Sequence, residues 1–252
     1  EHFRRAWGDA GTARAQWLMV GDQPHLRTRL LAWAARLDAA LRAAGAFDTL
    51  DGADPRAILG VLQALRQQQL LCALRETGFG AEFVNSVLEG MLRKSSTGAN
   101  DADEHWYPGR AVMITRNDPP AGLFNGDVGI TLRTRSARGE DSVQVWFESS
   151  PGAGDASGTP PGLRSFSPAS LPASEGAFAL TVHKSQGSEY QHVAVLLPPD
   201  ANNPLLSRQM LYTALSRARA SVELWSAEAA LAKATGTLAA RTARLGERLR
   251  TP

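Results

Sequence analysis

Residues 177–190, AFALTVHKSQGSEY, constrain the fold of this chain more than any other stretch. They open as an apolar run at 178–182 and then turn abruptly into a polar segment that contains Gly187. An apolar run bounded by a glycine-containing polar turn predicts a buried strand that feeds a loop. Rigid scaffolds often hold functional groups on such loops, and glycine lets the backbone approach a ligand closely. The polar groups here favour a phosphate-and-sugar ligand; a solvated turn is the alternative.

A second stretch, residues 209–224, has the sequence QMLYTALSRARASVEL. Its apolar residues recur at helical spacing, Arg217 and Arg219 follow near the predicted helix end, and a β-type segment begins at Ser221. The ordered pair TVHKSQGSEY and LYTALSRAR resembles motifs V and VI of superfamily 1 helicases. Those are the second-half motifs of a motor that is built from two RecA-like domains.

The segments before this pair predict an α/β domain. Residues 1–45 carry an apolar stripe at helix spacing and are expected to be helical. Asp54 and Pro55 suit the N-cap and the first position of a second helix. The apolar run at 70–74 predicts a buried parallel strand, and a glycine-rich loop then leads into a helix at 81–92. Its expected inward-facing residues are Phe83, Val84, Val87, Leu88 and Met91.

From residue 105 the sequence pattern changes to short strands separated by glycine- and proline-rich turns. This pattern suggests a small barrel. A tight turn is predicted at Asn125 and Gly126, and a hairpin tip at 149–162. The predicted strands are 111–115, 129–133, 142–147 and 163–166. Because the α/β pattern resumes at Phe178, the barrel is expected to interrupt one domain. The expected division is 1–104 for the first part with N-terminal helices, 105–172 for the barrel and 173–252 for the remainder.

Several of these segments resemble RecD-type helicases, between about residues 57 and 226. The run LLCALRETGFG is similar to the element after motif IV, and WYPGRAVMITRND with GLFNGDVGI is similar to an inserted SH3-like barrel. The strongest resemblance is to the RecD (alpha) chains of exodeoxyribonuclease V, the RecBCD enzyme. It implies a RecA-like motor domain 2 with that barrel, and an ATP-dependent 5′-to-3′ DNA helicase in double-strand-break repair. It also implies single-stranded DNA as substrate and RecB-like and RecC-like partner chains.

A phosphate-binding GxxxxGK[ST] loop is absent, because the sequence contains no Gly-Lys pair. The resemblance implies that ATP with Mg²⁺ is bound mainly by an N-terminal motor domain of the same polypeptide. The sequence begins at Glu1 without a methionine, which also suggests an excised segment. We therefore expect this segment alone not to hydrolyse ATP.

The resemblance also implies a map of the site. Arg217 takes the arginine-finger position, with a surface arginine as the alternative, and Glu189 is the second catalytic candidate. Nucleotide binding is assigned to Gln186, Gly187, Glu189 and Arg217. Contact with DNA phosphates is assigned to Thr181, His183 and Ser185, although His183 could be a core histidine. Asn85 joins the DNA set; a local hydrogen bond within the helix is its alternative.

Composition limits the remaining classes of protein. The net charge is only +2, so any nucleic-acid site depends on local placement of arginine and lysine. The single cysteine, Cys72, excludes a disulfide framework and a cysteine-based metal site, and no metal ligands are predicted. No apolar run is long enough to span a membrane, so no membrane contact and a cytoplasmic location are expected.

Two other functions fit the sequence. One is a stand-alone RecD-like helicase or a relaxase-type helicase, which a search for a large co-purifying partner would separate from a RecBCD chain. The other is a non-enzymatic DNA-binding remnant of a helicase. A GxxxxGK[ST] loop in the upstream sequence would favour the motor over the remnant.

Overall fold

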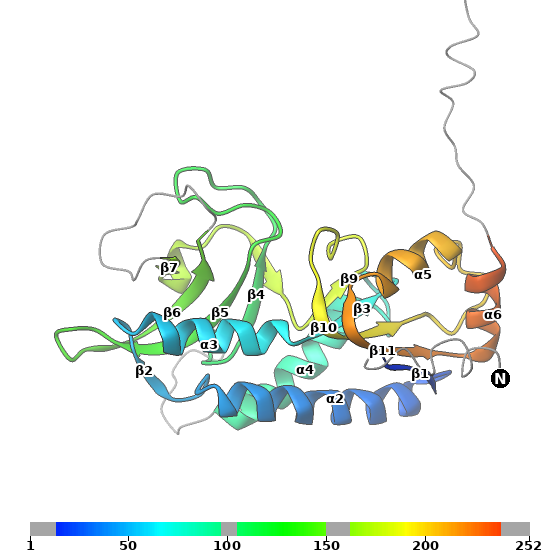
Figure 1. Ribbon diagram of the computed structural model, residues 1–252, viewed down its shortest axis with the longest axis horizontal. Coiled ribbons are helices and arrows are strands. Elements are labelled where there is room, and N and C mark those ends of the chain that lie inside the picture. The colour runs from blue at the N-terminus through cyan, green and yellow to red at the C-terminus, as the bar shows by residue number, and fades with distance from the viewer. Residues whose placement is uncertain (1–13, 97–104, 150–161, 238–252) are drawn as a thin grey trace, which may run out of the picture.

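The computed structural model describes residues 14–96, 105–149 and 162–237 (Figure 1). Its strands form a five-stranded sheet at one end of the molecule and a six-stranded sheet at the other. The hairpin tip predicted at 149–162 lies almost wholly outside the described residues, as does most of the tail from 235 onwards. No helix in the described ranges is both long and apolar enough to cross a membrane.

The five-stranded sheet has the order β1-β11-β10-β3-β9, and every neighbouring pair in it is parallel. Its strands are β1 (Arg14–Met19), β3 (Gln68–Cys72), β9 (Ala179–Thr181), β10 (Tyr190–Leu196) and β11 (Ala218–Ser226). The prediction of an α/β fold with a parallel sheet is therefore confirmed. The long apolar runs of β3 and β10 reflect burial on both faces, as parallel strands require.

The prediction that residues 1–45 are helical is wrong at Arg14–Met19, which form β1 at the edge of this sheet. The indole Nε1 of Trp17 donates to the carbonyl and hydroxyl oxygens of Ser226, at 3.3 and 3.0 Å. Pairing with β11 therefore determines the structure of this segment, because tertiary context overrides a weak local preference. The helical stripe begins only at Leu26.

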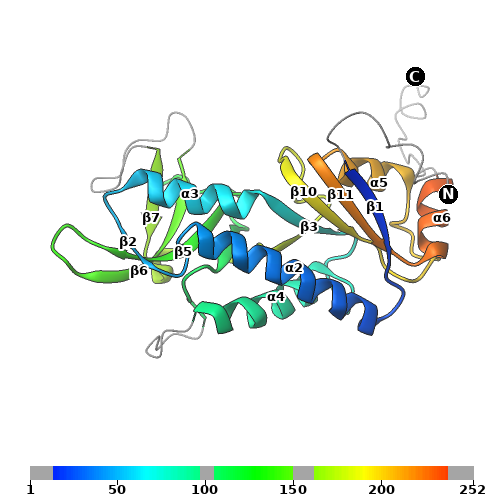
Figure 2. The same ribbon diagram turned by 60° about the horizontal axis from the view of Figure 1, so that its bottom comes forward.

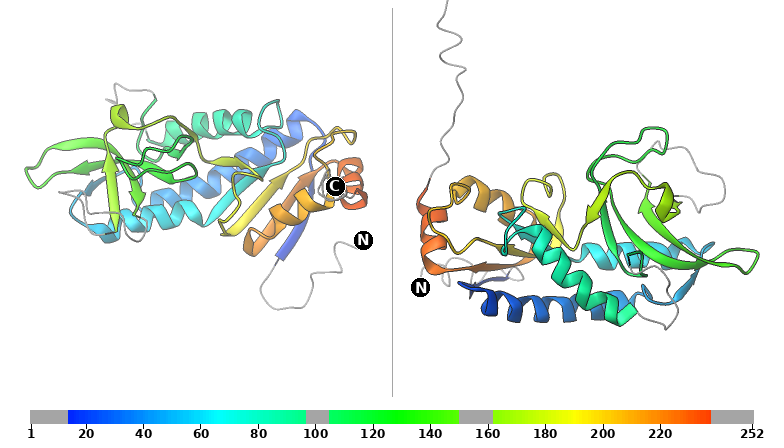
Figure 3. Two further views of the ribbon diagram at one scale, coloured as in Figure 1. Left: turned by 90° about the horizontal axis from the view of Figure 1, so that it is seen from above. Right: turned by 180° about the vertical axis from the view of Figure 1, so that it is seen from behind.

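The helices are α2 (Gln23–Ala43), α3 (Pro55–Arg66), α4 (Ala81–Ser96), α5 (Arg208–Leu215) and α6 (Glu228–Gly236). Helices α2 and α4 lie side by side on one side of the parallel sheet, and α5 lies on the other (Figures 1 to 3). The predicted start of α3 is confirmed, since the Asp54 carboxylate accepts from the backbone N–H of Arg56 at 2.9 Å. Its predicted inward side chains are buried too: Ile58, Val61, Leu62 and Leu65.

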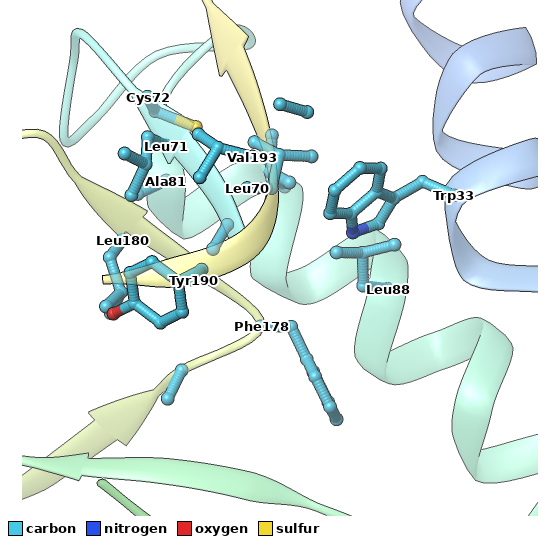
Figure 4. Close-up of a cluster of buried hydrophobic side chains, with 14 of the residues drawn as sticks. Trp33, Leu70, Leu71, Cys72, Ala81, Leu88, Phe178, Leu180, Tyr190 and Val193 are labelled. Atoms are coloured by element: carbon cyan, nitrogen blue, oxygen red, sulfur yellow. The ribbon is translucent and has the colours of Figure 1, made fainter. Parts of the chain in front are cut away.

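The main core lies between α2, α4 and the parallel sheet. Figure 4 shows Trp33 reaching from α2 toward the strands, with Leu88 of α4 beside it. The ring of Trp33 meets that of Trp225 edge to face, with centroids 5.8 Å apart. On α4 the predicted burial of Phe83 is wrong, because its side chain is 37% exposed and the helix instead buries Leu92.

The second sheet has the order β7-β6-β5-β4-β8, and β2 pairs in parallel with β5. Its strands are β2 (Thr49–Asp51), β4 (Ala111–Ile114), β5 (Val128–Arg135), β6 (Asp141–Glu148), β7 (Leu163–Phe166) and β8 (Ser174–Gly176), with a 3-10 turn η1 (Pro168–Ser170) after β7. All pairs along the β7-to-β8 path are antiparallel. The predicted strands all occur, and Gly126 takes the expected turn with a φ of +99°. Strands β2 and β8 lie outside 105–172; closure into a barrel stays a prediction.

Candidate functional site

The motif V loop, residues 182–189, connects β9 to β10. The backbone N–H of Val182 donates to the carbonyl of Cys72 at 3.0 Å, which fixes the start of the loop on the sheet. Gly187 has a φ of +87°, a conformation that favours glycine, and a Cβ placed there would meet no atom within 4 Å. The loop therefore presents open backbone to its surroundings at Gly187.

One side of this loop borders a groove of about 520 Å³, which we call the α4 groove. Helix α4, strand β8 and residues near 105–110 form its other walls. Thr181 and Lys184 line it from the motif V side. The Lys184 Nζ lies 2.6 Å from the Glu175 Oε1 of β8, so an ion pair joins the loop to the second sheet.

The other side of the loop borders a groove of about 340 Å³, which we call the α3 groove. Gly187, Glu189 and Arg219 line it together with the end of α3, including Arg66. The Glu189 Oε2 lies 2.8 Å from the Arg219 Nε, and both side chains are exposed. The structure thus pairs Glu189 with Arg219 rather than with Arg217.

Arg217 lies directly after the C-cap of α5 and is half-buried. Its guanidinium donates to the carbonyl of Thr213 at 3.2 Å, the carbonyl of Ser188 at 3.1 Å and the hydroxyl of Ser216 at 3.0 Å. The Arg217 carbonyl in turn accepts from the N–H of Tyr190 at 2.8 Å. Motif VI therefore holds the end of the motif V loop through both the side chain and the backbone of Arg217.

Asn85 is buried under the chain that passes between the two sheets, residues 176–179, which we call the sheet junction. Its Nδ2 donates to the carbonyls of Gly176 and Ala179 at 3.0 and 2.8 Å. Its Oδ1 accepts from the N–H of Ala179 at 2.8 Å. The buried Gln69 Nε2 donates to the junction as well, at 3.1 Å from the Phe178 carbonyl. Asn85 therefore has a structural role here, and its contact with DNA stays a prediction.

The remaining predicted residues differ in exposure. Ser185 is fully buried, and its hydroxyl donates to the Val182 carbonyl at 2.8 Å. His183 and Gln186 are exposed, and the hydroxyl of Thr181 accepts weakly from the Lys184 N–H at 3.4 Å. The structure thus brings Thr181 to the α4 groove and Gly187 and Glu189 to the α3 groove, while Ser185 stays beneath the surface.

Sequence reasoning missed a group of charged residues that surround the α4 groove. Arg110 is only 5% exposed, its Nε lies 3.6 Å from the Glu89 Oε1, and its guanidinium lies over the Trp106 ring. Burial, with the Glu89 carboxylate nearby, raises the pKa of the Tyr107 hydroxyl, so that group stays protonated. These residues are far apart in sequence, so only the fold brings them together.

Two further observations limit the chemistry. Burial raises the pKa of the Cys72 thiol, so this cysteine is a core residue and no nucleophile. Within the part of the chain that the structure describes, no group of three or more His, Cys, Asp or Glu side chains could hold a metal ion.

Comparisons with known proteins show sequence similarity to helicases. Residues 176–224 match the UvrD-like helicase C-terminal domain, a span that includes the motif V loop and α5. The RecD subunit of the RecBCD enzyme from Haemophilus influenzae is 34% identical over 160 residues, which are 64% of this chain and 21% of that protein. The RecD subunit from Mycolicibacterium smegmatis is 34% identical over 198 residues, 77% of this chain and 32% of that protein.

The ATP-dependent RecD2 DNA helicase of Deinococcus radiodurans is 32% identical over 151 residues, 60% of this chain and 19% of that protein. Among solved structures, Pif1 helicase from Candida albicans is 17% identical with a TM-score of 0.38, covering 90% of this chain and 59% of that one. The chain spans about a fifth to a third of the length of these curated relatives. It is a RecD-like protein, related in sequence to the RecD subunits of RecBCD enzymes over most of its length.

Proposed function

We propose that this chain forms the second motor domain of an ATP-dependent 5′-to-3′ DNA helicase of the RecD type. In this proposal residues 105–172 are an SH3-like barrel inserted between 1–104 and 173–252. The observation that carries it is the position of the motif V loop, which lies between the α3 and α4 grooves and is held by motif VI. A loop in that position can respond to a ligand on either side.

The α3 groove suits the phosphate and sugar parts of ATP. It combines two arginines, Arg66 paired with Glu148 and Arg219 paired with Glu189, with the open backbone at Gly187. Guanidinium groups bind phosphate oxygens in a bidentate fork, and Glu189 is placed to accept from a ribose hydroxyl or from water. Bound ATP with Mg²⁺ would supply the phosphoryl group and its charge neutralisation, and Gln186 and Gly187 would hold the nucleotide from this side.

Arg217 is the proposed arginine finger. In this structure its guanidinium donates to Thr213, Ser188 and Ser216, which uses three of the five N–H donors of the group. An arginine finger stabilises the charge that develops on the transferred phosphoryl oxygens. Because the chain lacks a GxxxxGK[ST] loop, an N-terminal motor domain has to supply the other half of the site, and this segment alone is inactive.

The α4 groove is the proposed path of single-stranded DNA. Thr181 and Lys184 line it, and His183 is exposed on the same loop. Contacts to backbone phosphates position a strand without reading its bases, so binding without sequence preference is expected. By analogy with the RecD relatives, RecB-like and RecC-like chains are the proposed partners, and double-strand-break repair the proposed process.

The test is DNA-stimulated ATP hydrolysis by the full-length protein and its Arg217→Ala variant, with and without its partner chains. We expect the variant to lose about 10³-fold or more in rate while it still binds single-stranded DNA. The matched control is Arg135→Ala, which removes an exposed, ion-paired arginine at the far end of the second sheet and should keep the rate.

The outcomes separate the candidate functions. A variant that keeps the wild-type rate would make Arg217 structural. A wild type that binds DNA but never hydrolyses ATP, with or without partners, would favour a DNA-binding remnant. Activity that needs no partner chain would favour a stand-alone RecD-like helicase.

A further inference from the structure

We propose that the Lys184–Glu175 ion pair is a latch between the motif V loop and the second sheet, which a nucleic-acid phosphate opens. The inference rests on the proposed function, since it takes the α4 groove as the path of single-stranded DNA. It gives Lys184 and Glu175 a role in positioning the motif V loop, which the resemblance to motifs V and VI does not assign to them.

The pair has the geometry of a strong but exchangeable contact. The Lys184 Nζ and the Glu175 Oε1 lie 2.6 Å apart, and each side chain is 30% exposed. Partial burial reduces screening by salt, so the pair is held more firmly than a fully exposed one. Both groups still reach the solvent of the α4 groove, so a phosphate can replace the carboxylate.

The Glu175 side of the pair is fixed. Glu175 lies on β8, in antiparallel register with Met113 of β4. At the next residue, Gly176, the carbonyl accepts from Asn85, and a Cβ would lie 2.4 Å from the Glu89 Oε1. Strand β8 is therefore clamped between β4 and α4 and cannot follow Lys184.

The Lys184 side belongs to the motif V loop, which is anchored by the buried Ser185 and by Arg217 and is exposed beyond Ser185. The residues after Ser185, up to Glu189, are exposed, and no atom lies within 4 Å of a Cβ built at Gly187. Breaking the ion pair therefore removes one restraint from the loop, whereas the strand keeps its own partners. The loop's far end, Glu189, pairs with Arg219 in the α3 groove, so its position links the two grooves.

The charges of the α4 groove explain why the latch needs a ligand to open. Three basic side chains there pair with carboxylates: Arg75 with Glu82 at 2.8 Å, Arg110 with Glu89 at 3.6 Å and Lys184 with Glu175 at 2.6 Å. The hydrogen bond to Glu82 raises the pKa of Arg75, and the charge of Glu175 raises it further. A phosphate diester must compete with these carboxylates. The Arg75 and Arg110 pairs hold no residue of the motif V loop, so displacement of Glu175 is the event that the loop can sense.

The test is a double-mutant cycle on the full-length protein, with the affinity for a labelled oligothymidylate measured over a range of salt concentrations. Glu175→Gln should tighten binding about two- to fivefold, since the lysine no longer has to leave a carboxylate. Lys184→Ala should weaken binding and reduce the salt slope by about 0.7, the value for one phosphate contact on a single strand. In the Lys184→Ala background, Glu175→Gln should have a clearly smaller effect, no larger than the effect of removing another groove carboxylate.

The matched control is Glu82→Gln, which removes the same charge from the same groove and leaves the Lys184 pair intact. Its effect on affinity should not depend on Lys184. A Glu175→Gln effect that is absent, or that is just as large without Lys184, would overturn the latch. A wild type that binds no single-stranded DNA would instead overturn the proposed function.

Chemical labelling gives a second measurement that is independent of DNA affinity. Lys94, Lys184 and Lys233 are the lysines of this sequence, so labelled peptides are easily assigned. Without DNA, an amine-reactive reagent should label Lys184 faster in Glu175→Gln than in the wild type, whereas labelling of the exposed Lys233 should not change. Equal labelling of Lys184 in the two proteins would show that the pair does not hold it.

Discussion

The parallel and antiparallel sheets of this protein bury different kinds of side chain. Strands β3 and β10 contribute apolar residues that pack against α2 and α4, around Trp33 and Trp225. The second sheet buries two arginines, Arg110 and Arg164, which are 5% and 3% exposed. The Arg164 Nη1 donates to the Gly122 carbonyl and so holds a loop in place.

The difference concerns buried charge, because both sheets bury apolar side chains. The parallel sheet depends on apolar area removed from water, which is non-directional. The second sheet also buries apolar side chains, among them Val112, Ile114 and Phe147, and adds a directional contact from Arg164 to the loop at Gly122. Between them lies the sheet junction, where the amides of Asn85 and Gln69 bond the backbone that passes from one sheet to the other.

The largest effect on stability should follow from Trp33→Ala, in the core between α2 and the parallel sheet. The side chain is 1% exposed, and its truncation should lower the free energy of unfolding by about 3–5 kcal/mol. The control is Leu31→Ala on the same helix, which is 55% exposed and should cost less than about 0.5 kcal/mol. Equal denaturation midpoints for the two variants would contradict the packing of α2 on the sheet.

An intermediate effect should follow from Asn85→Ala at the junction. The change leaves the Ala179 N–H and two carbonyls without their partner, which should cost about 2–3 kcal/mol. Hydrogen exchange should speed up at residues 176–181 more than in β5 and β6. Asn85→Asp keeps the shape and the acceptor but places a buried carboxylate against two carbonyl oxygens, so it should cost at least as much as Asn85→Ala. An equal increase in hydrogen exchange across both sheets would contradict a local role of Asn85 at the sheet junction.

The smallest effect is a pH dependence at the tip of the second sheet. The hydrogen bond from Arg135 lowers the pKa of Asp141 below its ordinary value of 3.8. A lowered folded-state pKa gives stability that is present above 3.8 and is lost as the pH falls through the folded value. Acid titration of stability should therefore be flatter below pH 4 in Asp141→Asn than in the wild type. Identical curves at low salt would show that the exposed pair contributes nothing measurable.

The two sheets also differ in how well their strands could be predicted from the sequence. Apolar runs predicted β3 and β10 because a strand buried on both faces needs such runs. The three-residue strands β2 and β8 have no such pattern, and their pairing with β5 and β4 depends on register across the fold. Strand β1 was mistaken for helix because a half-exposed edge strand carries a weak periodic signal.

The candidate site shows the same limit: contiguous motifs can be recognised in the sequence, whereas contacts between distant residues cannot. The motif pair located the loop that carries Gly187 and the helix that Arg217 follows, because those motifs are contiguous in sequence. The partners of the charged side chains could not be predicted, since Lys184 meets Glu175 and Glu189 meets Arg219 only after the sheets are assembled. Asn85 was noticed for its polarity, but its bonds to residues 176–179 depend on where β8 and β9 meet.

The strand order also has a kinetic consequence. Strands β3 and β10 are neighbours at the centre of the parallel sheet, yet the whole run from β4 to β8 lies between them in the chain. Closing so long a loop costs entropy before any contact repays it, whereas β4 to β7 pair with their chain neighbours. The antiparallel sheet should therefore form early and shorten the loop, and pulse-labelled refolding should show protection in β5 and β6 before β10. The segment that separates β3 from β10 in the sequence would then speed their pairing during folding.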